Sequence, residues 1–301
     1  MLIVIQQVAI LAIFALAGYA LARAGRVKSG QTQILSTLLI YVCFPCTVFR
    51  TFSSQFTVAY LSEKYSFVLI SSVLFAVVIL VSKWAARRMT GKRYEQEVYG
   101  YTLIVPNTGY MGAPLVENLY GQAVLLNQMM FQLPLTLFTY TEGYRMLTGG
   151  EKFSFRRLMN PVTTAILLGC VVGISGLPVP SVLSVAAERA SNCVGPLSML
   201  LTGITISEFP FARLLQNKMA YLITLLRLVV IPFVLAGIAS LFFSREIVLA
   251  VVMMYSMPCG LNTIVFPKLI GEDCEIGASL ALLSNVLAIL TIPLCTAVFL
   301  P

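Results

Sequence analysis

The chain has 301 residues, of which 58% are hydrophobic and 11% charged, and its mean hydropathy is +0.90. A soluble domain carries roughly 25% charged residues, so this composition excludes an ordinary soluble protein and predicts a helical membrane protein. Histidine is absent from the sequence, which removes the commonest metal ligand and proton shuttle. Together with the absence of a nucleotide-binding P-loop, this predicts a protein that is not an enzyme and has no metal or cofactor.

Ten apolar stretches approach the length of about 20 residues that crosses a bilayer. In chain order, these predicted spans 1 to 10 cover residues 2–22, 33–53, 65–86, 97–119, 123–146, 160–177, 190–208, 218–243, 246–269 and 275–299. No basic residue precedes the apolar run of span 1, so we do not expect a cleaved signal peptide there.

The net charge of +8 would suit a nucleic-acid binder, but the placement of the basic residues argues against such a partner. Most lysines and arginines lie in the short loops that follow the odd-numbered spans. Cytoplasmic loops of membrane proteins carry this excess of positive charge. We therefore expect a multi-pass protein of the inner (plasma) membrane with both termini on the non-cytoplasmic side.

Five spans in each half would insert the second half upside down relative to the first, which predicts an inverted repeat. The first repeat would comprise residues 1–146, the second residues 160–301, and residues 147–159 would form a short cytoplasmic linker. Proline positions also correspond, since Pro45 of span 2 matches Pro196 of span 7. The alternative is that proline and glycine are simply common in membrane helices.

Spans 4 and 9 are each interrupted by a polar, proline-flanked break. The residues that make these breaks are Pro106, Gly109, Gly112 and Pro114 in span 4, and Pro258, Gly260 and Pro267 in span 9. Proline removes a backbone donor and clashes with the preceding turn, so such a segment opens the helix. Open backbone inside a membrane is tolerated where it is buried in protein or lines a cavity. Paired breaks therefore indicate a transporter's substrate site.

The N-terminal end of each half-helix would present free N–H groups and about half a positive charge, which suits an anion. Side chains beside the breaks add donors, and the candidate substrate-binding residues there are Asn107, Thr108, Tyr110, Asn262 and Thr263. The alternative for the two asparagines is that they cap the second half-helices, a role compatible with substrate binding.

Span 5 carries polar residues at a spacing of four, namely Gln128, Gln132, Thr136 and Tyr140, which share one helix face. Hydrogen bonding between helices explains most of this stripe equally well, and Gln132 is its best candidate for substrate contact.

Arg227 lies well inside span 8, where a charge is a functional hypothesis by default. It could pair with Glu142 or Glu117, attract the anion, or extend its side chain to the membrane edge.

Several of these motifs resemble the auxin efflux carrier family: residues 106–115, residues 35–45, Asn160-Pro161, and Pro258 with Asn262. The short linker suits the bacterial branch of that family. The resemblance implies an all-α fold with ten transmembrane helices in a 5+5 inverted repeat, related to that of bile-acid sodium symporters, with spans 4 and 9 crossing at their breaks. It also implies a dimerising scaffold of spans 1, 2, 6 and 7, and a transport domain of spans 3–5 and 8–10 that moves like an elevator. Asn107 would hold the substrate carboxylate.

The sequence and the resemblance together predict a secondary transporter, expected to be an efflux carrier, for small organic anions such as auxin-like indole acids or other carboxylates. The alternative is a sodium- or proton-coupled carboxylate symporter of the same architecture. A receptor or an enzyme fits less well, because no output domain and no catalytic constellation is present.

Overall fold

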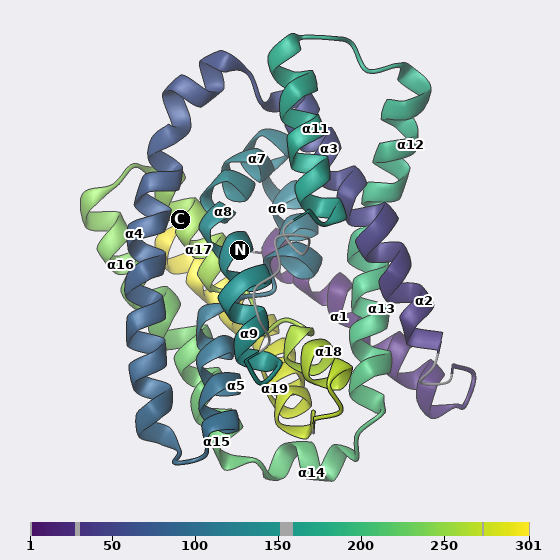
Figure 1. Ribbon diagram of the computed structural model, residues 1–301, viewed down its shortest axis with the longest axis vertical. Helices are drawn as coiled ribbons and strands as arrows, with labels where there is room; N and C mark the ends of the chain where they lie inside the picture. The colour runs from purple at the N-terminus through teal and green to yellow at the C-terminus, as the bar shows by residue number, and fades with distance from the viewer. Residues whose placement is uncertain (1, 28–30, 151–158, 273, 301) are drawn as a thin grey trace.

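The computed structural model describes residues 2–27, 31–150, 159–272 and 274–300, and in these ranges the chain is helical with one isolated backbone bridge (Figure 1). Five helical stretches are long and apolar enough to cross a membrane: Leu2–Arg23, Thr32–Gln55, Val58–Met89, Lys218–Phe242 and Glu275–Phe299. The prediction of an all-α membrane protein is therefore confirmed. Residues 151–158 of the predicted linker lie outside the described residues.

The helices of the first half follow the predicted spans 1 to 5. They are α1 (Leu2–Arg23), α2 (Thr32–Leu38), α3 (Phe44–Gln55), α4 (Val58–Met89), α5 (Arg93–Ile104), α6 (Ala113–Tyr120), α7 (Gln122–Phe131), α8 (Leu133–Phe138) and α9 (Tyr144–Leu147). Turns of π-helix at Leu39–Cys43, Thr108–Gly112 and Thr139–Gly143 lead into α3, α6 and α9.

The described part of the second half is also helical. Its helices are α11 (Pro161–Ser175), α12 (Ser181–Asn192), α13 (Val194–Ser207), α14 (Phe211–Gln216), α15 (Lys218–Leu225), α16 (Ile231–Phe242), α17 (Arg245–Tyr255), α18 (Asn262–Leu269) and α19 (Glu275–Phe299), with a π-helical turn at Leu226–Val230. Within the predicted span 7, residues 190–208, α13 covers Val194–Ser207, and the separate helix α12 precedes it. Glu188 and Arg189 are both exposed on α12.

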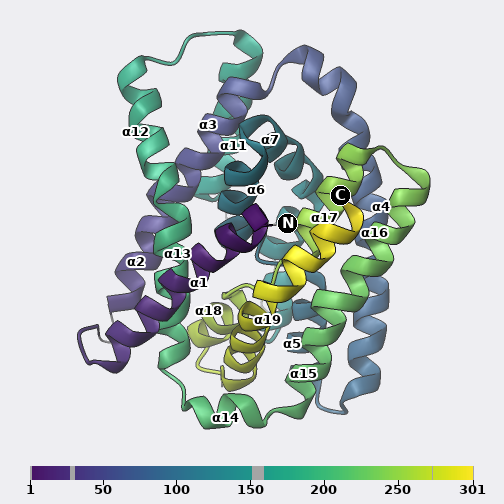
Figure 2. The same cartoon turned by 180° about the vertical axis from the view of Figure 1, so that it is seen from behind.

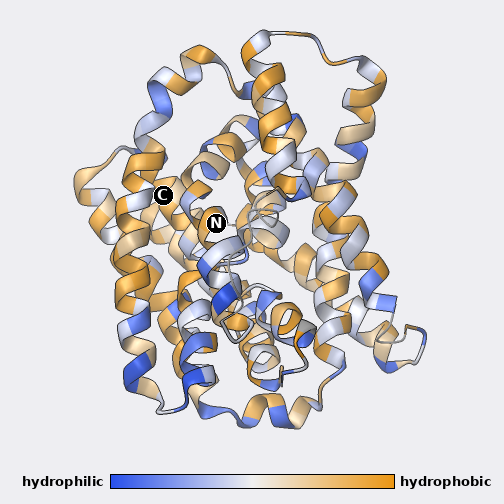
Figure 3. Ribbon diagram, viewed as in Figure 1, coloured by the Kyte–Doolittle hydropathy of each residue, from blue (hydrophilic) through white to orange (hydrophobic). Residues whose placement is uncertain are grey.

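Apolar residues cover the outside of the molecule as well as its core (Figure 3). On α4, one exposed stripe consists of Leu69, Val73, Val77, Leu80 and Trp84. Exposed charged residues gather instead at the turn from α4 to α5, namely Arg87, Arg88, Lys92 and Arg93. Such an apolar surface with a charged edge is suited to contact with lipid.

Two helix pairs pack at unusually short range. α1 lies along α13, and α3 lies along α11. A Cβ atom on Gly203 of α13 would lie 1.9 Å from the carbonyl oxygen of Ala15, and one on Gly173 of α11 would lie 2.3 Å from that of Phe56. Small residues let helix backbones approach closely in membrane proteins. Glycine therefore sets the separation of both pairs, which join span 1 to span 7 and span 2 to span 6.

Spans 4 and 9 are interrupted as predicted, and the two unwound segments touch. Pro106 and Cys259 form an antiparallel bridge, and the N–H of Asn107 donates to the carbonyl oxygen of Pro258 at 2.8 Å. The two interrupted helices therefore meet at their breaks, in the interior of the bundle. On the reverse side of the molecule, α1 packs against α19 (Figure 2).

We expect Gly203→Ala to force α1 and α13 apart and to lower the free energy of unfolding by about 1–3 kcal/mol. Gly237→Ala on α16 is the matched control, because nothing lies within 4 Å of the position that its new methyl group would take. Both changes raise intrinsic helix propensity equally, so the difference between their thermal midpoints in detergent isolates packing. Equal midpoints would contradict the close-packing argument.

Candidate functional site

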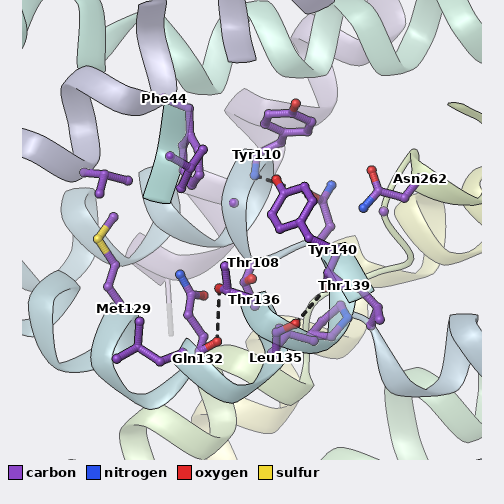
Figure 4. A pocket seen from close by; sticks show the side chains of 18 of the residues that line it. Phe44, Thr108, Tyr110, Met129, Gln132, Leu135, Thr136, Thr139, Tyr140 and Asn262 are labelled. Atoms are coloured by element: carbon purple, nitrogen blue, oxygen red, sulfur yellow. Dashed lines mark hydrogen bonds between the residues drawn. The ribbon is translucent and has the colours of Figure 1, made fainter. Parts of the chain in front are cut away.

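A cavity of about 130 Å³ lies where the two breaks meet (Figure 4). The break segments contribute residues 105–110 and 260–262 to its lining. Span 5 contributes polar groups from Gln132, Thr136, Thr139 and Tyr140, and α3 and α11 contribute an apolar wall of Phe44, Val48, Phe52, Val162 and Ile166. The cavity therefore has a donor-bearing side at the crossing and an apolar side opposite.

Asn107 combines the two roles that its position suggested. Its Oδ1 accepts a hydrogen bond from the N–H of Tyr110 at 3.3 Å, which caps the half-helix that follows. Its Nδ2 is buried and has no hydrogen-bond partner in the described part of the chain. Capping fixes the side chain, and Asn107 as a whole lines the cavity.

Asn262 is held differently. It is the first residue of α18, and Leu261 occupies the capping position without a side-chain bond, so the capping alternative is wrong for Asn262. Its Nδ2 donates to the hydroxyl of Tyr101 at 2.9 Å. Asn262 is half-buried and lines the cavity, with its amide oriented by α5.

Of the four other predicted substrate-binding residues, three line the cavity and the fourth does not. Thr108, Tyr110 and Gln132 line it; the Tyr110 ring packs edge-on against Phe44, with ring centroids 6.2 Å apart. The Oε1 of Gln132 is buried without a partner in the described residues. Thr263 is fully buried away from the cavity, and its hydroxyl donates to the carbonyl oxygen of Gly260 at 3.1 Å.

The glycines of the breaks differ in how closely other segments approach them. A Cβ atom on Gly109 would lie 3.2 Å from the Phe44 ring, and one on Gly112 would lie 3.4 Å from Met257. Gly260 faces the Cα atom of Asn107, 3.9 Å from its own Cβ position. Among the prolines, Pro106 and Pro258 lie in the unwound segments, whereas Pro114 and Pro267 lie in the helices that follow, α6 and α18.

Sequence reasoning missed part of the lining. Thr139 lies beside Tyr140 at the start of a π-helical turn, where the wider turn changes which residues share a face. The apolar wall from α3 and α11 carries no polar signal that could have marked it. Gln128, part of the predicted stripe, does not line the cavity, and both of its amide atoms are buried without a partner among the described residues.

A second, larger cavity of about 880 Å³ adjoins the first. Its lining includes Tyr41, Cys46 and Tyr144, and it shares Tyr140 with the smaller cavity. Tyr140 therefore lies between the buried cavity at the crossing and a wider, mostly apolar space between span 2, span 5 and span 6.

The structure excludes two of the three roles considered for Arg227, pairing with an acid and extension to the membrane edge. Glu142 accepts hydrogen bonds from Lys83 and Arg145, and Glu117 pairs with Arg50, so neither acid binds Arg227. The side chain is fully buried, so it does not extend to the membrane edge. Arg227 also does not line the cavity.

Two interrupted helices that cross at a buried, donor-lined cavity in an apolar helical bundle define the class of membrane transporters. The chain matches the family model described as membrane transport protein at residues 3–155 and 144–296, and it belongs to this family, that of the auxin efflux carriers. A relative from Methanocaldococcus jannaschii, the uncharacterized transporter MJ1031, is 25% identical over 309 residues, covering 97% of this chain and 98% of the relative.

We expect Thr263→Val to lower the free energy of unfolding by about 1–2 kcal/mol, because it leaves the carbonyl oxygen of Gly260 without its buried donor. Thr108→Val, at the cavity wall, should lower the free energy of unfolding by less than half of that amount. Thermal midpoints of both variants in detergent check this difference. A larger loss for Thr108→Val would contradict the placement of the two threonines.

Proposed function

We propose that the protein is a secondary transporter of small organic anions, which binds the carboxylate of its substrate in the cavity at the crossing of the two breaks. The observation that carries this proposal is Asn107, which lines that cavity and whose buried Nδ2 has no hydrogen-bond partner in the described part of the chain. A buried donor without an acceptor costs free energy, and a bound carboxylate oxygen would remove that cost.

The ends of two half-helices support an anion over a neutral solute. The half-helix that runs from Thr108 through α6 and the one formed by α18 both begin at the cavity. Each N-terminus carries roughly half a positive charge, and two together favour a carboxylate. None of the described residues that line the cavity is charged, so no side chain there competes with the substrate for these donors.

The apolar wall favours an acid with an aromatic or aliphatic body. Phe44, Phe52, Tyr110 and Tyr140 all line the cavity, and aromatic rings bind flat apolar groups through offset or edge-on contacts. Indole acids and other compact carboxylates have this combination of a charged end and an apolar body.

For the movement, we propose an elevator in which spans 3–5 and 8–10 carry the site past a scaffold of spans 1, 2, 6 and 7. The close glycine contacts of α1 with α13 and of α3 with α11 support a rigid scaffold. The cavity lies between these two groups, since α3 and α11 form one wall and the breaks form the other. The same scaffold is the surface we propose for a homodimer in the inner membrane, with ten spans and both termini non-cytoplasmic.

The membrane potential would drive export. One negative charge that moves outward across an inside-negative potential of 100 mV gains about 2.3 kcal/mol, which corresponds to roughly fortyfold accumulation outside. Symport with sodium or protons in the same architecture is the competing mechanism, and dependence of transport on either gradient would distinguish it.

The test is transport by the purified protein in proteoliposomes, with indole-3-acetate, malonate and malate as substrates, with and without sodium and pH gradients. Asn107→Ala should reduce transport about tenfold or more, because a hydrogen bond to a charged group is worth about 1.5–3 kcal/mol. Asn118→Ala, an exposed asparagine on the same half-helix, is the matched control and should stay within about twofold of wild type. Full transport by a folded Asn107→Ala variant would refute the proposed site.

A further inference from the structure

Arg227 is the one charged side chain that is fully buried among the described residues. It lies on the π-helical turn Leu226–Val230, between α15 and α16. Its Nε and both terminal nitrogens have no hydrogen-bond partner in the described chain. A buried guanidinium in this condition needs a negative charge nearby, because an isolated buried ion is strongly unfavourable.

The surroundings of Arg227 supply no such charge. The groups within electrostatic range are Tyr255 and Cys259, both uncharged at neutral pH in their ordinary forms. The hydroxyl of Tyr255 is itself buried without a partner among the described residues. The acids of the neighbouring spans are engaged elsewhere, as shown above for Glu142 and Glu117. The positive charge is therefore not neutralised within the described part of the chain.

The crossing connects Arg227 to the cavity. Cys259, which lies within range of the guanidinium, forms the backbone bridge to Pro106. The residue after Pro106 is Asn107, which lines the cavity and whose Nδ2 has no partner in the described part of the chain. The turn that carries Arg227 packs against α5, which leads into the first break, and against α19, while Arg227 itself does not line the cavity.

We propose that Arg227 is the fixed countercharge of the transported anion. Its guanidinium does not touch the substrate; it stabilises a carboxylate in the cavity through the crossed segments by its field. This inference rests on the proposed function, and it adds that the chain itself provides the charge balance, so anion binding requires no bound cation. The charge of Arg227 would not increase the affinity for a neutral molecule of the same shape.

The expected size of the effect follows from Coulomb's law. A unit charge at a separation of about 10 Å, in a medium with an effective dielectric constant of about 20, changes a binding constant roughly tenfold. Salt screens exposed charges within a Debye length of about 10 Å at 0.1 M but screens buried ones much less. The contribution of Arg227 should therefore persist at high ionic strength.

The experiment compares binding of indole-3-acetate with binding of its neutral amide, indole-3-acetamide, at low and high sodium chloride concentrations. Arg227→Met should weaken binding of the acid about tenfold at both concentrations and leave the amide within about twofold. Arg227→Lys should keep most of the affinity for the acid. Lys218→Met removes an exposed charge at the start of the same helical span. It should change neither the affinity for the acid nor the affinity for the amide. Unchanged binding of the acid, or equal losses for acid and amide, would overturn the proposal.

A ligand-free measurement keeps the proposal testable whatever the substrate is. If the charge of Arg227 is uncompensated in the empty protein, Arg227→Met should leave the thermal midpoint unchanged or raise it. A lowered midpoint would show that Arg227 stabilises the fold and would overturn the countercharge role. If neither indole compound binds even to wild type, the choice of substrate in the proposed function fails, and the thermal midpoint alone decides the role of Arg227.

Discussion

The structure depends on one backbone contact, the pairing of two unwound segments in the middle of the bundle. Opened helices leave N–H and C=O groups that a membrane interior cannot hydrate. Here the N–H of Asn107 donates to the carbonyl oxygen of Pro258, and Pro106 faces Cys259, so each break satisfies part of the other. The half-helix ends that this pairing exposes are the features from which an anion site can be built.

The same pairing explains the packing around it. At the crossing, Gly260 lies beside Asn107 and Gly112 beside Met257, where a Cβ atom would meet its neighbours at ordinary van der Waals distance. The polar groups of the crossing are then held by neighbouring helices: the hydroxyl of Ser284 on α19 accepts from the N–H of Cys259 at 3.0 Å, and Tyr101 on α5 accepts from Asn262. The site is thus fixed by helices on both sides of the breaks, which positions its donors before any substrate arrives.

The two breaks and the place of Asn107 beside the first of them could be predicted, because proline and glycine act locally. The role of Thr263 could not. Thr108 and Thr263 each follow an asparagine, but Asn107 precedes its half-helix whereas Asn262 is the first residue of α18. This shift of one residue rotates the side chain by about 100°, from the cavity into the protein. Where a helix starts depends on tertiary contacts, which an Asn-Thr pair does not encode.

The chemistry of the site separates recognition of charge from recognition of shape. The described lining of the cavity is uncharged, so its donors and aromatic rings respond to where a carboxylate and an apolar body lie. The positive charge, unpaired among the described residues, lies on Arg227, which is not part of the cavity lining. A cation within the cavity would bind a carboxylate tightly and slow its release, since a direct charged pair is much stronger than a field acting over a distance. A carrier must release its cargo in every cycle, and a remote charge with neutral contacts serves that need.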